Sequence, residues 1–181
     1  MTNPMRRIVQ CRTAVCLVLL GFAAAVSAQT PEWKPYSYPA DGFQASFPSA
    51  PDVQKKDIPT DAGTFQLRSY IATDGAVAIF VGVCDYGAST NGKDPDVLLQ
   101  GAKNGALQNS SSHLIGEKAI ALGVYPGLEF QAVSDSAQYT ARIYMVGNIL
   151  YEILVVAPLD KSFADATRFL DSFQLIAKTA N

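Results

Sequence analysis

The stretch that most constrains the fold is Tyr125 to Pro158, which reads YPGLEFQAVSDSAQYTARIYMVGNILYEILVVAP. It contains three runs of apolar, β-branched and aromatic residues separated by two turn signals, which is the pattern of an antiparallel meander. The second turn is formed by Gly147 and Asn148, residues that a two-residue hairpin accepts at positive φ. The sequence therefore predicts three consecutive antiparallel strands in this part of the chain.

The rest of the chain adds further strands and two helices. Apolar alternation and apolar runs between turn signals predict strands at 43–47, 53–58, 64–72, 76–83, 113–122 and 173–176. Asp94 and Pro95 form a favoured helix start, and helical spacing continues to about Leu107. A second helix after Pro158 is indicated by apolar residues on one face, Phe163, Ala166, Phe169 and Leu170. The fold class expected is α+β: an antiparallel β-sheet with a mid-chain helix and a C-terminal helix packed on it.

The mid-chain helix presents small residues on its inward face, Leu98, Gly101, Ala102 and Gly105. Such residues either let the helix lie close on the sheet or leave a cavity beneath it. Each glycine inside a helix costs about 1 kcal/mol, which indicates a steric reason for its presence. Close packing is the favoured interpretation, and a cavity that holds a small apolar ligand is the alternative.

Residues 1–28 have the features of a secretory signal peptide. Arg6, Arg7 and Arg12 precede an apolar run from Ala14 to Val26, and small residues follow to Ala28. The apolar run is shorter than the roughly 20 residues of a membrane-spanning helix. We therefore expect a periplasmic or secreted protein with no transmembrane anchor after signal cleavage.

Charge and length limit what the exported part can be. The signal segment holds three of the 14 basic residues and none of the 16 acidic ones, so the remaining 153 residues carry a net charge of about −5. No nucleic-acid partner is expected, because binding phosphates needs a basic surface. Prolines and aromatic residues predict an extended arm at 29–42, packed over the edge of the core. Residues 43–181 are expected to form a single domain.

Strand register, counted residue by residue from the two turns of the meander, predicts four neighbouring side chains on the sheet. Glu129 falls opposite Arg142, and Tyr144 falls opposite Tyr151, on one face of the sheet. The functional interpretation is an anion or carbohydrate site, and the favoured structural interpretation is a cross-strand ion pair. Glu152 belongs to the opposite face, so a pair of catalytic carboxylates is not supported.

Other chemistries have little support in the sequence. His113 is the single histidine, so no zinc site can be assembled from histidines, and no cofactor fingerprint appears. Cys84 is the single cysteine outside the signal segment, which leaves no internal disulfide. A Cys84 and His113 nucleophile pair remains as a third, weak hypothesis of a hydrolase. No cofactor and no metal are expected.

The order of these features resembles a known group of proteins. The segments FQASFPSAP, PGLEF, ARIYMVGNILYEILVV and FLDSF, between Phe43 and Ile176, are similar to small exported bacterial domains of unknown function with the PsbP-like fold. The resemblance implies an antiparallel sheet flanked by helices, in an accessory or binding module rather than an enzyme. The photosystem members of this group assist manganese and calcium retention. That role is not transferred, because the chain matches the broad pattern of the group and not the photosynthetic members' own segments.

Two functional hypotheses follow, and they place the binding site differently. The first is an exported, non-catalytic module that binds a protein or envelope component, with Glu129, Arg142, Tyr144 and Tyr151 as its binding residues. The alternative is a small apolar-ligand carrier with a cavity between the mid-chain helix and the sheet.

Overall fold

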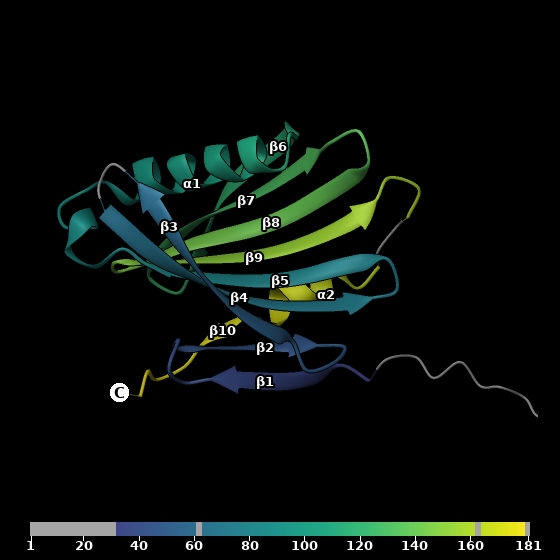
Figure 1. The fold of residues 1–181 in the computed structure, drawn as a ribbon, viewed down its shortest axis with the longest axis horizontal. Coiled ribbons are helices and arrows are strands. Elements are labelled where there is room, and N and C mark those ends of the chain that lie inside the picture. The colour runs from purple at the N-terminus through teal and green to yellow at the C-terminus, as the bar shows by residue number, and fades with distance from the viewer. Residues whose placement is uncertain (1–31, 61–62, 162–163, 180–181) are drawn as a thin grey trace, which may run out of the picture.

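The computed structural model of the protein describes residues 32–60, 63–161 and 164–179, and the expected signal segment lies outside them. The described residues form three layers (Figure 1). The middle layer is a seven-stranded antiparallel sheet in the spatial order β3 (Asp52–Thr60), β4 (Gly63–Asp74), β5 (Val77–Asp85), β9 (Ile149–Pro158), β8 (Ala137–Val146), β7 (Tyr125–Val133) and β6 (His113–Leu122). It holds all three strands of the predicted meander.

Different elements pack on the two faces of this sheet. Helix α1 (Pro95–Asn109), which follows a short 3-10 turn at Gly87–Thr90, lies on one face. On the other face lie helix α2 (Ala166–Ser172) and a small three-stranded sheet of β1 (Lys34–Tyr38), β2 (Phe43–Phe47) and β10 (Gln174–Leu175). The α+β class expected from the sequence is confirmed.

Strand alternation divides the apolar residues between two clusters. On β5, Ile79 and Val81 are fully buried toward the small sheet, whereas Cys84 belongs to the cluster beneath α1. On β9, Ile153 joins the first cluster and Leu150 the second. Because successive side chains point to opposite faces of a strand, each strand contributes to both clusters. This explains the continuous apolar runs that the sequence shows in β5 and β9.

The register predicted for the meander is confirmed. Glu129 pairs with Arg142 between β7 and β8, and Tyr144 pairs with Tyr151 between β8 and β9. Gly147, in the β8–β9 turn, has a φ of 60°, in the left-handed region that favours glycine. The turn residues of the sequence therefore predicted the cross-strand neighbours correctly.

The N-terminal part of the fold differs from the expectation. The middle of the predicted arm at 29–42 is strand β1, which pairs with β2. Pro35 is accepted there because β1 is an outer strand of the small sheet, where a missing N–H need not break the ladder. The predicted first strand, β2, pairs with β1 and β10 instead of extending the meander.

The aromatic side chains of the predicted arm do pack on the core, as expected. The ring centroids of Tyr38 and Phe43 are 5.1 Å apart, and those of Tyr36 and Phe47 are 6.1 Å apart. These distances fall within the range of favourable aromatic pairs. The strand at 34–38 therefore contributes to the core through one face.

Helix α1 begins as predicted but packs differently. The Asp96 N–H donates to the Asp94 side chain over 2.9 Å, and Pro95 is the first helical residue. A Cβ atom built on Gly101 or Gly105 has no neighbouring heavy atom within 4 Å. The favoured prediction of close packing at these glycines is therefore wrong, and the space next to them is open.

Candidate functional site

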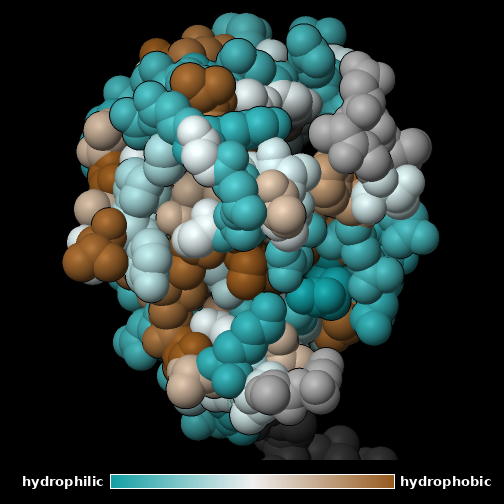
Figure 2. All heavy atoms as spheres, turned by 90° about the vertical axis from the view of Figure 1, so that its left-hand side faces the viewer, coloured by the Kyte–Doolittle hydropathy of each residue, from teal (hydrophilic) through white to brown (hydrophobic). Residues whose placement is uncertain are grey.

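The candidate site is a groove between α1 and the part of the sheet that α1 leaves uncovered. Helix α1 packs on β7 and β8, so β4, β5 and β9 are not covered by it on the same face. The groove has a volume of about 660 Å³. Its sheet side is apolar and is lined by Phe65, Leu67, Phe80, Cys84, Leu150 and Leu154. Figure 2 shows the left-hand side of Figure 1, where apolar surface is visible in recesses bordered by hydrophilic side chains.

The groove exists because α1 is held at one side and has two glycines among small and apolar residues at the other. Leu99 is 2% exposed in the cluster beneath the helix. The buried Lys103 ammonium donates to Glu117 on β6 over 2.5 Å and to Gln100 over 2.6 Å. Gly101 and Gly105 lie along the groove and contribute no side chain to fill it. The glycines thus set the width of the groove.

Glu152 is the one acidic residue that lines the groove among the described residues. Its neighbours across the sheet are Ile143 on β8 and Gly82 on β5, and its carboxyl group forms no ion pair or hydrogen bond with any residue that the structure describes. Burial raises the pKa of Glu152 from its ordinary value near 4.5 to about 7, because an apolar environment disfavours the charged form. A carboxyl group at this position changes its charge near neutral pH.

This raised pKa predicts a pH-dependent stability. Between pH 4.5 and 7 the folded protein retains a proton that the unfolded chain releases, so the stability contributed by Glu152 falls as the pH rises through this window. We expect Glu152→Gln to be more stable than the wild type by about 1–3 kcal/mol at pH 8 and equally stable at pH 4. Urea unfolding at both pH values measures the difference. An equal difference at both pH values would contradict the assignment.

Cys84 lies in the groove but has no histidine beside it. Burial raises the pKa of the Cys84 thiol, which keeps it protonated and weakly nucleophilic. His113 is exposed at the start of β6, and β9, β8 and β7 lie between β5 and β6. Four interstrand spacings separate the two strands by roughly 19 Å. The Cys84 and His113 pair of the third, weak hypothesis is therefore not formed, and the hydrolase hypothesis loses its basis.

The four residues predicted from the register lie on the other face of the sheet. Glu129 accepts from Arg142 over 2.7 Å, and Arg142 also donates to Asp171 at the end of α2 over 2.6 Å. Tyr144 and Tyr151 are 5% and 2% exposed, beneath the layer that contains α2. The structure thus brings Glu129 and Arg142 together as predicted, and it buries both tyrosines. A binding role for these four residues stays a prediction.

The ion pairs around Glu129 show what holds this cluster in place. Burial raises the pKa of Glu129, but hydrogen bonds from Lys118 and Arg142 outweigh this effect and lower it below the ordinary value. The Lys118 ammonium is 2.8 Å from the carboxylate. Lys118, Glu129, Arg142 and Asp171 therefore form a continuous charge chain from β6 to α2. Such a chain stabilises the docking of α2 on the sheet.

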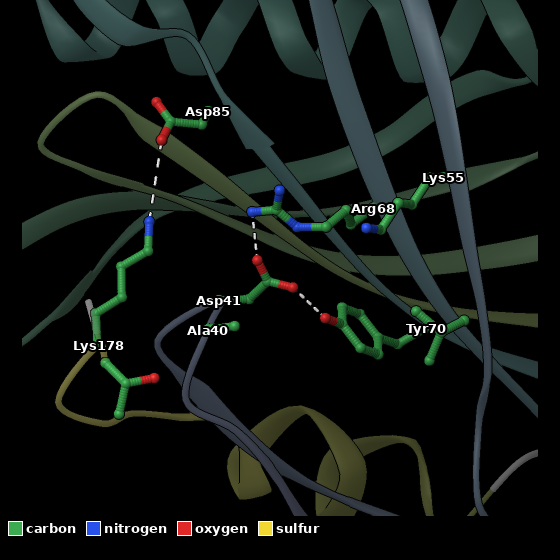
Figure 3. A pocket seen from close by; sticks show the side chains of 9 residues that line it. Ala40, Asp41, Lys55, Arg68, Tyr70, Asp85 and Lys178 are labelled. Carbon is green, nitrogen blue, oxygen red and sulfur yellow. Dashed lines mark hydrogen bonds and ion pairs between the residues drawn. The ribbon is translucent and has the colours of Figure 1, made fainter. Parts of the chain in front are cut away.

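A second recess, lined by several charged side chains, was not predicted from the sequence (Figure 3). Asp41, 3% exposed, forms an ion pair with Arg68 and accepts a hydrogen bond from the Tyr70 hydroxyl. The Tyr151 hydroxyl donates to the Asp41 carbonyl oxygen over 2.7 Å. The recess has a volume of about 600 Å³. One signal was available in the sequence: Asp41 with Gly42, whose φ is 74°, is a typical turn pair.

Solved structures with a similar arrangement of the chain include one that matches over most of its length. A solution structure of cyanobacterial PsbP (CyanoP) from Synechocystis sp. PCC 6803 matches with a TM-score of 0.55 and 11% sequence identity, and it covers 85% of this chain and 98% of that one. The chain has a PsbP-like fold. A structure from Bacteroides thetaiotaomicron VPI-5482 matches with a TM-score of 0.42 and 16% identity, covering 78% of this chain and 48% of that one. No protein-family model and no curated protein matches the sequence. The PsbP-like fold expected from the resemblance is confirmed, and at 11% identity the likeness concerns the fold alone.

Proposed function

We propose that the protein is an exported, non-catalytic accessory module that carries a small apolar molecule in the groove beneath α1. The observation that carries this proposal is an apolar groove of about 660 Å³ beside α1, with open space next to Gly101 and Gly105. Ligand sites typically have volumes of about 300–1,000 Å³ and a predominantly apolar lining with few polar groups. The groove meets both criteria, and it was the alternative that the sequence left open.

Several observations favour this site over the four residues predicted from the register. Tyr144 and Tyr151 are buried among core side chains, and Arg142 is held by two carboxylates. A ligand would have to displace these contacts, whereas the groove is open. A protein or envelope component as partner remains compatible with an accessory module, and we place no contact surface for it.

Export rests on the features of residues 1–28, which precede the described structure. No helix in residues 32–60, 63–161 and 164–179 has the length and apolar character needed to cross a membrane. The proposal that the protein is non-catalytic is supported by the separation of Cys84 and His113 across the sheet. Among the described residues no group of three or more His, Cys, Asp or Glu side chains is placed to hold a metal ion.

Filling the groove tests the proposal. The neutral fluorophore N-phenyl-1-naphthylamine should bind the wild type with enhanced emission. Gly105→Leu should weaken binding at least about tenfold, because the new side chain occupies open space in the groove. The same change should leave stability equal or slightly higher, since leucine favours a helix over glycine by up to about 1 kcal/mol.

The matched control is Asn104→Leu, which adds the same side chain at an exposed position on the same helix. Its affinity for the fluorophore should stay within about twofold of the wild type, because a leucine at this position points away from the groove. Absence of fluorophore binding to the wild type, or equal binding to Gly105→Leu, would overturn the proposal.

A further inference from the structure

We propose that the molecule carried in the groove has a protonated amine head, and that this head binds between the Glu152 carboxylate and the aromatic side chains beside it. The inference rests on the proposed carrier function and specifies its ligand class. It follows from the position of Glu152 on the sheet, from the absence of an internal partner among the described residues, and from the type of side chains around it.

Among the described residues, no side chain forms an ion pair or hydrogen bond with the Glu152 carboxylate, so at a pH where it is ionised its counter-charge has to come from a ligand. Its cross-strand neighbour on β8 is Ile143, 1% exposed, and its neighbours on the same face of β9 are Leu150 and Leu154. None of these side chains can donate a hydrogen bond. A carboxylate in apolar surroundings is destabilised unless it is paired. A cation brought by a ligand supplies the missing partner.

An aromatic ring occupies the position directly across from Glu152. Its neighbour on β5 is Gly82, and a Cβ built there would lie 2.7 Å from the Phe80 ring. The ring therefore covers Gly82 next to the carboxylate. The Phe65 and Tyr86 rings, whose centroids are 5.0 Å apart, also line the groove. A carboxylate together with aromatic rings is the combination that recognises ammonium groups, because ring faces attract cations.

The other titratable groups of the groove leave Glu152 as the determinant of charge. Besides Glu152, the titratable residues that line it are Cys84, Tyr86, Lys93 and Tyr139. Burial raises the pKa values of Cys84 and of Tyr86, the latter to about 12, so both side chains are neutral near pH 7. Lys93 is exposed and is the one basic residue of the lining within the described part of the chain. It weakens attraction of an amine without pairing with Glu152.

Three probes with one apolar chain separate head-group recognition from apolar binding. Dodecylamine, 1-dodecanol and dodecanoate, each below its aggregation concentration, are titrated against the wild type, and displacement of N-phenyl-1-naphthylamine is measured. At pH 8 we expect the amine to bind about tenfold more tightly than the alcohol, and dodecanoate to bind most weakly. At pH 5.5, where Glu152 is protonated and the amine still charged, the preference for the amine should disappear.

Three variants complete the test. Glu152→Gln should remove the preference for the amine at pH 8 and leave the affinity for 1-dodecanol within about twofold, because the two side chains have similar shapes. Lys93→Gln should raise the affinity for the amine about two- to threefold. Glu32→Gln, an equal charge change at an exposed position, is the control and should change nothing.

The outcomes distinguish this inference from the proposed function. If the amine and the alcohol bind the wild type equally, or if the preference for the amine is the same at pH 5.5 and pH 8, the amine assignment is wrong while the carrier function stands. The pH comparison uses the wild type alone, so it does not depend on the folding of a variant. If none of the three probes binds, the carrier function itself fails.

Discussion

Replacing Asp41 with alanine is expected to lower the free energy of unfolding by about 3–5 kcal/mol, because it leaves the Arg68 guanidinium without its partner carboxylate. The Asp41 carboxylate pairs with Arg68 and also accepts from the Tyr70 hydroxyl, and it is 3% exposed. Arg68 and Tyr70 belong to β4, whereas Asp41 lies in the turn between β1 and β2. The network is therefore one of the connections between the small sheet and the large one (Figure 3).

Equilibrium urea unfolding, followed by circular dichroism, measures the effect. Asp160→Ala is the control, because Asp160 is exposed, and its loss should stay within about 0.5 kcal/mol. The double variant Asp41→Ala with Arg68→Met should lose less than the sum of the single variants, because it removes the unpaired charge as well. A loss below about 1 kcal/mol for Asp41→Ala would show that solvent replaces the carboxylate at little cost.

Phe43→Ala is expected to destabilise the fold by a similar amount, about 3–5 kcal/mol. Phe43 is fully buried on β2, and its ring centroid lies 4.9 Å from that of Tyr70 and 5.7 Å from that of Phe173. These neighbours come from the large sheet and from the segment after α2. Removing the ring leaves a cavity, which the surrounding structure can close only in part.

The size series at this position distinguishes cavity formation from a general loss of apolar area. Phe43→Leu should cost less than Phe43→Ala, because leucine fills part of the space. Val124→Ala removes apolar atoms at a position that is 88% exposed and should have almost no effect. Equal losses for the leucine and alanine variants at Phe43 would contradict the cavity explanation.

Local sequence signals predicted the large sheet well. The β7 to β9 register follows from turn residues and from the two-residue period of a strand, both of which act within a hairpin. The same register predicted Glu129 opposite Arg142 and Glu152 on the opposite face of the sheet, and the structure confirms both positions. These predictions needed no information about distant parts of the chain.

The small sheet could not be predicted because its strand pairing is partly non-local. Gln174 on β10 pairs with Gln44 on β2, across most of the chain. Such a pairing leaves no periodic signal in either segment. Pro35 also opposed a strand prediction, and only the position of β1 at the outer edge of the small sheet makes a proline acceptable.

The sequence could not decide between close packing and a groove, because helix periodicity does not show how far a helix stands from a sheet. Gly101 and Gly105 fit both close packing and an open groove. The buried residues of α1 are Leu99 and Lys103, which lie on a different side of the helix from Gly101 and Gly105. Their contacts hold the helix so that the glycines face open space. Lys103 is a residue that sequence reasoning places in solvent, and its partner Glu117 lies on β6 beyond the loop after α1.

The outer strands of the large sheet have a consequence for self-association. An unpaired strand edge can recruit another chain and start aggregation. On β3, this risk is opposed by exposed Lys55, Lys56 and Asp57. On β6, the register shifts between Leu114 and Gly116, which interrupts the regular ladder that an added strand would need. Both ends of the sheet thus resist growth by strand addition, so the large sheet is expected to stay at seven strands when the protein is concentrated.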